Sequence, residues 1–254
     1  MLVVAFASVA IIAEINSGLF APPPIPIQIY QPNPPEPTEK VVSIIFDDGW
    51  KSQLDAIPVL EQYNFSATFA IVASYPDYPD FMNWKEIAFI AQKGHDIASH
   101  TLTHPRLSTL DNETLHTELS KSQQILRSKG YPANILVYPY GDGNDNQTVR
   151  DAVAKYYLLA RGTEIGKYNL TSPDRFTITS YGIYNYTTMT DFADYLDGTQ
   201  GNNVTLLYYH KISPENIDMA IPIETFQAQM QYLKDNGYTV KTISELFLKT
   251  LPPE

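Results

Sequence analysis

Short apolar runs alternate with amphipathic stretches along the chain from residue 40 onward. The apolar runs are about four to eight residues long and rich in Val, Ile, Phe and Tyr, which is typical of strands. We therefore predict strands at 41–46, 66–72, 96–99, 135–140, 156–160, 176–183, 204–209 and 238–241. Apolar residues at helical spacing predict helices at 52–63, 111–129, 222–236 and 243–249.

This alternation predicts the fold class. Strands that are apolar on both faces and alternate with helices usually pair in parallel and are covered by helices. Seven or eight such units in one stretch of chain favour an α/β domain built as a small (β/α) barrel over an open sheet. In such barrels, the chemistry is carried where strands end and the loops toward the next helix begin.

Two segments of different character precede this domain. Residues 1–13 are apolar and uncharged, but shorter than the roughly 20 residues that a membrane-spanning helix needs. We predict a signal peptide or membrane anchor at 1–20, with a buried first strand as the alternative. Residues 21–39 contain eight prolines and predict an extended spacer, so that the folded domain occupies 40–254. This layout is typical of a secreted or surface-tethered protein.

Composition narrows the partners and the possible ligands. A net charge of −11 argues against nucleic acid or an anionic membrane surface as the main partner. The absence of cysteine excludes disulfides and thiolate ligands, so any metal must be held by His, Asp or Glu. Asn-X-Ser/Thr sequons are in excess of the roughly two expected by chance, which suggests either a glycosylated exported protein or a polar surface without glycans. The sequons begin at Asn64, Asn112, Asn146, Asn169, Asn185 and Asn203. Export without cysteine favours a prokaryotic cell exterior.

Polar residues gather where four of the predicted strands end. Each would be unremarkable alone, because an Asp often caps a helix and a lone His is often structural. Together, at one rim of one barrel, they predict a functional site. The residues are Asp47 and Asp48 after the first strand, His100 and His104 after the third, Tyr138, Pro139 and Tyr140 after the fourth, and His210 after the seventh.

The spacing of His100 and His104 constrains a metal site. In an extended strand, residues four apart lie about 13 Å from each other. One metal needs both nitrogens at about 2.1 Å, so we expect the segment after Ser99 to curl into a helix-like turn that Pro105 ends. Two imidazoles then need a third, anionic ligand, which Asp47 or Asp48 supplies.

The two adjacent acids need separate roles. Successive residues of a strand point to opposite faces, so both can serve one site only where the strand breaks, and Gly49 permits that break. One acid then binds the metal and the other stays free as a base for water. A bound cation would keep both ionised, and without it we expect one of the pair to protonate near neutral pH.

At these residues the sequence resembles the polysaccharide deacetylase family, the carbohydrate esterases with a NodB-like domain. The matching stretches are "FDDG" at 46–49, "SHTLTHP" at 99–105, "YPYG" at 138–141 and "LLYYH" at 206–210. The likeness extends over about residues 41–247. It implies a distorted (β/α)7 barrel and a metal-dependent hydrolase acting on acetylated polysaccharide. The "YPYG" form is similar to the branch that contains poly-N-acetylglucosamine deacetylases.

The resemblance also implies roles for individual residues. Asp48, His100 and His104 would hold a divalent metal, usually zinc. Asp47 would be the general base and His210 the general acid. The backbone N–H of Tyr140 would stabilise the oxyanion, with Tyr138 and Pro139 beside it in the substrate-binding motif. The reaction implied is removal of N-acetyl groups from amino sugars of a cell-surface polysaccharide or glycan.

One departure from the family's motif pattern leaves alternative functions open. Many members have an Arg that steadies the catalytic Asp where this chain has Val137, and no clear Asp partner is evident near residues 170–182. A non-catalytic glycan-binding module and an O-acetyl polysaccharide esterase therefore remain alternatives. A glycosidase is disfavoured, because its two carboxylates must lie about 5 to 9.5 Å apart across the scissile bond. We predict that His95 is structural and His116 lies on a surface helix. Candidate aromatic platforms for sugar rings are Trp50, Trp84, Tyr75, Tyr78 and Tyr184.

Overall fold

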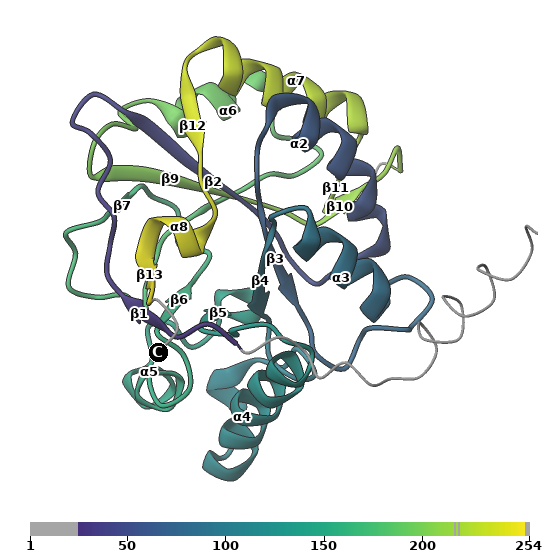
Figure 1. Cartoon of the computed structure of the whole chain (residues 1–254), viewed down its shortest axis with the longest axis vertical. Coiled ribbons are helices and arrows are strands. Elements are labelled where there is room, and N and C mark those ends of the chain that lie inside the picture. Colours follow the sequence, from purple (N-terminus) through teal and green to yellow (C-terminus); the bar gives the residue numbers. More distant parts are fainter. Residues whose placement is uncertain (1–24, 216, 218, 252–254) are drawn as a thin grey trace, which may run out of the picture.

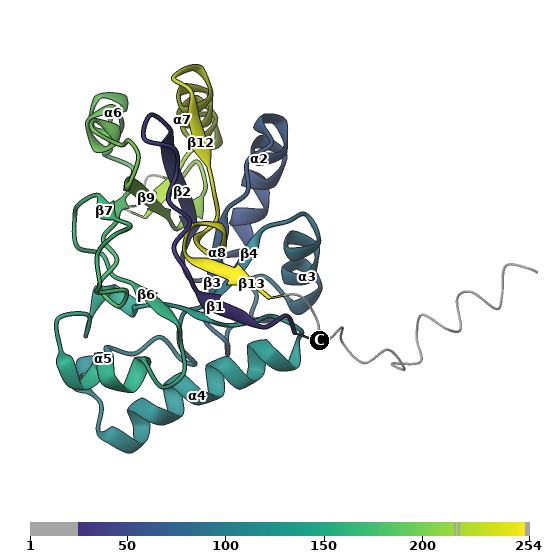
Figure 2. The same ribbon diagram turned by 60° about the vertical axis from the view of Figure 1, so that its left-hand side comes forward.

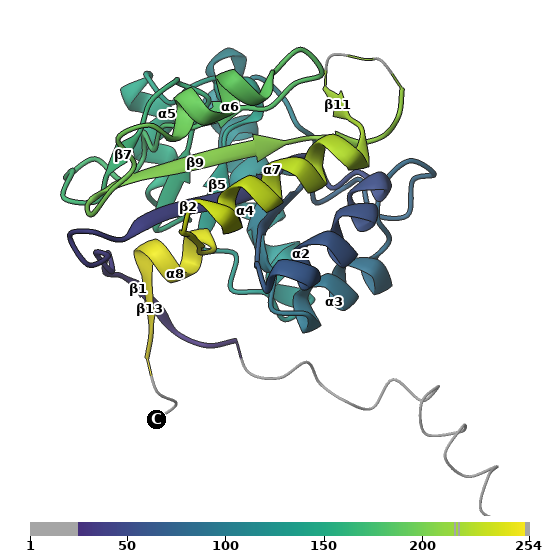
Figure 3. The same ribbon diagram turned by 90° about the horizontal axis from the view of Figure 1, so that it is seen from above.

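Strand β2 (Lys40–Phe46) is the central strand of the molecule (Figure 1). The computed structural model describes residues 25–215, 217 and 219–251. Every residue of β2 after Lys40 is buried, which explains its unbroken apolar sequence. Strand β9 (Asn203–Tyr209) pairs with β2 in parallel along one edge, as Figure 3 shows. Along the other edge, β12 (Tyr238–Val240) pairs with the first half of β2 and β3 (Thr68–Ile71) with the end.

The remaining strands extend this sheet and curl it. Beyond β3 follow β4 (Asp96–Ser99), β5 (Ile135–Val137) and β6 (Leu159–Arg161), all parallel. Ile178 forms a parallel bridge to Arg161 of β6, and β8 (Tyr181–Gly182) pairs in parallel with β9. The segment predicted as one strand over 176–183 therefore joins the two margins of the sheet through two short contacts. The result is a single α/β domain with a curled, distorted barrel sheet, as predicted.

Helices lie around the outside of the sheet (Figures 1 and 2). The helix predicted at 52–63 is a 3-10 turn, η1 (Lys51–Ala56), that continues into α2 (Ile57–Tyr63). The other three predicted helices are α4 (Asn112–Ser128), α7 (Ile223–Asp235) and α8 (Ile243–Phe247). The structure adds α3 (Trp84–Gln92), α5 (Gln147–Val153) and α6 (Met189–Leu196), with short 3-10 turns η2 (Leu107–Thr109) and η3 (Pro139–Gly141).

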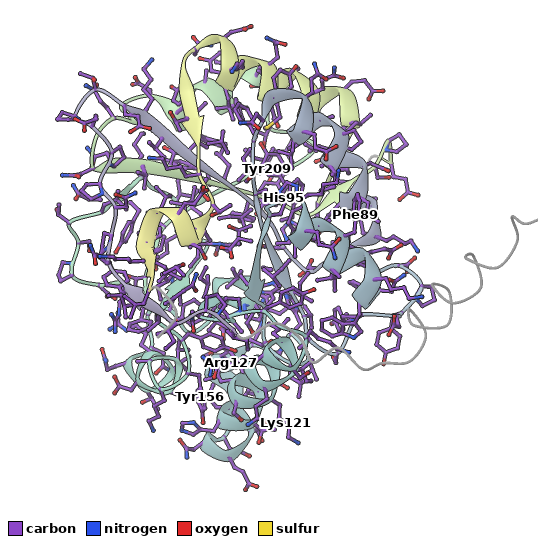
Figure 4. All side chains as sticks on the ribbon, viewed as in Figure 1. Phe89, His95, Lys121, Arg127, Tyr156 and Tyr209 are labelled. Atoms are coloured by element: carbon purple, nitrogen blue, oxygen red, sulfur yellow. The ribbon has the colours of Figure 1, made fainter. Side chains whose placement is uncertain are left out.

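Aromatic packing joins the sheet to its helices. Phe46 of β2 stacks on Phe69 of β3 at 4.9 Å between ring centroids and packs against Tyr209 of β9 and Phe226 of α7. All four side chains are fully buried. Figure 4 shows Tyr209 in this interior, whereas Lys121 lies on the outer side of α4. This packing fixes β2, and hence the loop that follows it.

Part of the predicted spacer belongs to the folded domain. Strand β1 (Gln28–Tyr30) pairs antiparallel with β13 (Leu248–Thr250), as Figures 1 to 3 show. Beyond it, backbone N–H groups of Gln31 and Asn33 donate to carbonyls of α8 at 2.9 and 2.8 Å. The segment is extended, as predicted, but residues 28–33 are bound to the domain. The signal peptide or anchor predicted at 1–20 lies outside the described residues.

Two further short pairings belong to the described structure. Strand β7 (Tyr168–Asn169) pairs antiparallel with β9, and β10 (Lys211–Ile212) pairs in parallel with β11 (Ala220–Ile221) just after β9. In the part of the chain that the structure describes, none of the helices has the length and apolar character needed to cross a membrane.

Candidate active site

An open cleft of about 540 Å³ lies at the carboxyl ends of the central strands. Loops after β2, β4, β5 and β9 contribute to it, as the parallel sheet predicts. All the predicted site residues line it except Pro139, which is buried behind its neighbours. The lining residues among them are Asp47, Asp48, His100, His104, Tyr138, Tyr140 and His210.

The turn after β2 separates the two adjacent acids. Asp48 and Gly49 both have positive φ, at 74° and 79°, so the strand ends abruptly after Asp47. A Cβ at Gly49 would also lie 3.1 Å from the side chain of Ile71, so this position favours glycine twice over. The break lets the Asp47 and Asp48 carboxylates reach different partners within one site, as expected from the sequence.

Asp48, His100 and His104 form a compact triangle of donors. Oδ1 of Asp48 lies 3.3 Å from Nε2 of His100 and 3.2 Å from Nε2 of His104, and the two ring nitrogens are 3.1 Å apart. Nδ1 of His100 lies 2.8 Å from the Val137 carbonyl and donates to it, which leaves Nε2 free as a lone-pair donor. A zinc ion about 2.0 to 2.2 Å from each donor fits a triangle of this size.

The histidines reach this geometry differently from our expectation. The segment from His100 to His104 is a bend with positive φ at Thr101 (66°) and His104 (64°), so the predicted helix-like turn is wrong. Glu118, buried on α4, holds the bend in place. Its carboxylate accepts hydrogen bonds from the backbone N–H groups of Leu102 and Thr103 at 3.0 and 2.9 Å, and from the Thr103 hydroxyl at 2.6 Å.

The electrostatics of Asp48 differ from the expected repulsion. Burial alone would raise the pKa of this carboxyl, but hydrogen bonds from His100 and His104, together with the charges of His100 and His210, hold its pKa well below the usual range. Asp47 has a separate cationic partner. The histidines therefore favour the charged form of Asp48, and the prediction that one acid of the pair protonates near neutral pH without a metal stays untested.

Arg161 is that partner, and the sequence analysis did not find it. Its guanidinium, fully buried at the end of β6, donates to Oδ1 of Asp47. In the β5–β6 pairing, Arg161 is the register partner of Val137, the position at which many family members have the steadying Arg. The guanidinium of Arg161 therefore lies at the same level of the sheet as Val137, one strand further along. In the sequence, this role was indicated by an Arg that directly follows the apolar run 156–160.

His210 follows β9 and faces the acids. Its Nε2 lies 4.0 Å from Oδ2 of Asp48, and burial lowers the pKa of its ring. Gln53, fully buried in η1, ties the ends of the two strands together. Its side-chain amide donates to the backbone carbonyls of Asp47 and His210 at 2.6 and 2.9 Å, a contact that the sequence did not reveal.

The third motif shapes the wall of the cleft. Tyr138 is fully buried, and burial holds the pKa of its hydroxyl far above the usual range. Tyr140 has φ of 58° and a side chain 56% exposed, with its ring 4.6 Å from that of His104. A tyrosine in the left-handed region is strained, and such strain is common at functional sites. Of the three residues, Tyr140 is the one whose side chain a ligand can reach freely.

The two histidines outside the cleft have structural contacts. His95 is buried, and its Nδ1 accepts from the backbone N–H of Ala67 at 3.1 Å. His116 lies on α4, where its Nδ1 is 3.0 Å from the hydroxyl of Tyr156. Among the candidate platforms, Trp50, Tyr75 and Tyr184 line the cleft, while Trp84 packs against the apolar core instead.

Comparison with known proteins gives matches over the part of the chain that holds the first motifs. Residues 35–158 match the family model for polysaccharide deacetylase. A gellan lyase from a Bacillus species is 36% identical over 124 residues, which are 48% of this chain and 5% of that protein. A peptidoglycan-N-acetylglucosamine deacetylase from Bacillus cereus is 31% identical over 112 residues, which are 42% of this chain and 38% of the relative. The chain thus spans less than half the length of either relative.

A solved structure agrees with the fold. A polysaccharide deacetylase from Bacillus cereus superposes with a TM-score of 0.56 at 25% identity. The superposition covers 61% of this chain and 51% of the other.

Proposed function

We propose that this chain is a member of the polysaccharide deacetylase family, whose model it matches over residues 35–158, and that it is a metal-dependent hydrolase that removes N-acetyl groups from amino sugars of a cell-surface polysaccharide or glycan. One observation carries the proposal. The Asp48–His100–His104 triangle shares its cleft with a base candidate, Asp47, and an acid candidate, His210. These are the groups that hydrolysis of an amide requires.

The metal site is proposed for a divalent cation, with zinc preferred because two imidazoles and one carboxylate suit it. Bound there by Asp48, His100 and His104, the cation would supply Lewis acidity toward the acetyl carbonyl and lower the pKa of a water molecule.

The side chains of this protein would transfer the protons of the reaction. Asp47, fixed by Arg161, accepts a proton from the attacking water as the new C–O bond forms. The backbone N–H of Tyr140 stabilises the negative charge that develops on the carbonyl oxygen. His210 donates a proton to the amide nitrogen as the C–N bond breaks. The products are acetic acid, which loses its proton to give acetate, and a free amino sugar. Transfer of one proton from Asp47 back to His210 through solvent restores both groups, so atoms and charge balance.

The N-terminal segments suggest where in the cell the protein acts. We propose export to a prokaryotic cell exterior, with residues 1–20 as signal peptide or membrane tether and with glycans on some of the sequons. The composition of residues 1–39 and the likeness to a peptidoglycan-N-acetylglucosamine deacetylase support this proposal.

The experiment that tests the function compares acetylated substrates. We expect the purified chain to release acetate from N-acetylglucosamine oligomers, and a chelator or Asp48→Ala to abolish the release. Faster release from acetyl-xylan would favour the O-acetyl esterase instead. Tight glycan binding with no acetate release from any substrate would identify a non-catalytic module, although Arg161 removes the argument from Val137 that favoured it.

A further inference from the structure

We propose that Trp50 positions Asp48 as a metal ligand by holding one oxygen of its carboxylate. The indole Nε1–H of Trp50 donates to Oδ2 of Asp48 at 2.8 Å. Oδ1, the other oxygen, is the one that lies 3.3 and 3.2 Å from the Nε2 atoms of His100 and His104. Each oxygen therefore has its own partner. This inference rests on the metal site of the proposed function and not on its substrate.

The indole ring is itself held on both faces. Phe81 stacks on it with 4.3 Å between ring centroids and 24° between ring planes. Nζ of Lys211 lies 3.9 Å from the centre of the same ring. Two groups at these distances cannot occupy one face, so the ring is enclosed between an aromatic ring and a cation. The edge that carries the N–H is left to point at Asp48.

Backbone contacts fix the position of the ring. Trp50 and Phe81 form an antiparallel bridge between their two loops. On either side of that bridge, Lys51 N–H donates to the Asp80 carbonyl at 2.9 Å and Met82 N–H donates to the Gly49 carbonyl at 3.0 Å. Residues 49–51 and 80–82 therefore hold the indole at a set distance from the end of β2.

This environment decides between two roles for Trp50. A platform for a sugar ring needs a free aromatic face, and both faces of this ring are covered. A donor that orients a ligand needs only its edge. Hydrogen bonds from such outer groups fix a ligand's orientation, and their loss typically costs about 10- to 100-fold in metal affinity. Trp50 is thus a positioning residue, and the sugar-platform interpretation of it is not retained.

Zinc affinity tests the proposal directly. Trp50→Phe removes the N–H and keeps an aromatic ring between Phe81 and Lys211, while Trp84→Phe makes the same change on α3, away from the cleft. Affinity is measured by competition with a chromophoric chelator. We expect the dissociation constant to rise about 10- to 100-fold for Trp50→Phe and to stay at the wild-type value for Trp84→Phe. Equal zinc affinities of Trp50→Phe and wild type would overturn the proposal.

A second measurement needs no altered residue at the site. The chain has two tryptophans, so its spectrum of indole N–H resonances is simple, and the Trp84→Phe variant assigns both. On addition of zinc to the wild-type protein, we expect the Trp50 resonance to shift and the Trp84 resonance to stay. A stationary Trp50 resonance would refute the proposal. Tight zinc binding without acetate release would instead contradict the proposed function and leave the role of Trp50 intact.

Discussion

Asp47 and Asp48 are neighbours in the chain but contact different groups. Asp47 is 3% exposed and meets Arg161, while Asp48 meets two histidines and an indole. Removing one partner of a buried ion pair leaves an unpaired charge and typically costs about 3 to 5 kcal/mol. The two acids are thus tolerated because each has its own partners.

Arg161→Met should expose this cost. We expect it to lower the free energy of unfolding by about 3 to 5 kcal/mol, measured by urea denaturation. Adding Asp47→Asn removes the stranded charge, so the double variant should recover most of the lost stability but no activity. A double variant as unstable as Arg161→Met alone would contradict the pairing.

His95 gives a prediction about pH. Burial lowers the pKa of its ring in the folded protein. As pH falls below about 6.5, the unfolded chain therefore binds a proton that the folded protein does not, and stability decreases. His95→Asn keeps an acceptor for the Ala67 N–H but does not titrate. We expect the wild-type free energy of unfolding to fall more steeply than that of His95→Asn between pH 6.5 and the lower pKa; parallel pH profiles would be evidence against this role.

At the scale of single residues, the sequence predicts the site residues that lie at strand ends. It misses the residues that contact them from other strands and helices. Asp48, His100 and His104 were predictable because parallel strands place their carboxyl ends together. Arg161 and Glu118 were not, because their roles depend on which strands and helices are adjacent. Neither follows from spacing along the chain.

Strands and helices also divide into those that the sequence predicts and those that it misses. All the predicted strands have a counterpart, since strands buried on both faces form unbroken apolar runs. Helices α3, α5 and α6 were missed. They are seven to nine residues long, so they carry little periodic signal, and α3 and α6 start at capping boxes rather than at long apolar patterns. The paired segments β1 and β13 were hidden because each is short and half exposed.

Helix α4 carries a testable contribution to the metal site. Glu118→Ala removes the carboxylate that accepts from Leu102 and Thr103 in the bend before His104, so we expect zinc affinity to fall about tenfold in a chelator competition assay. Glu118→Gln keeps one acceptor oxygen, and its amide can donate to the Thr103 hydroxyl, so it should stay near wild type. Wild-type affinity in Glu118→Ala would show that the bend holds itself.

For the whole molecule, the fold explains how distant parts of the chain reach one cleft. The curled sheet places β9 beside β2, so His210 lies close to Asp47 and Asp48. It also places β6, two strands beyond β4 in the sheet, where the guanidinium of Arg161 contacts Asp47.

The central claim is that the two adjacent acids divide the chemistry between them. The most direct test measures zinc content and acetate release on the same preparations of Asp47→Asn and Asp48→Asn, with N-acetylglucosamine oligomers as substrate. We predict that Asp47→Asn retains about one zinc per chain and releases no acetate, whereas Asp48→Asn loses both. Full zinc binding by Asp48→Asn, or acetate release at the wild-type rate by Asp47→Asn, would contradict the account.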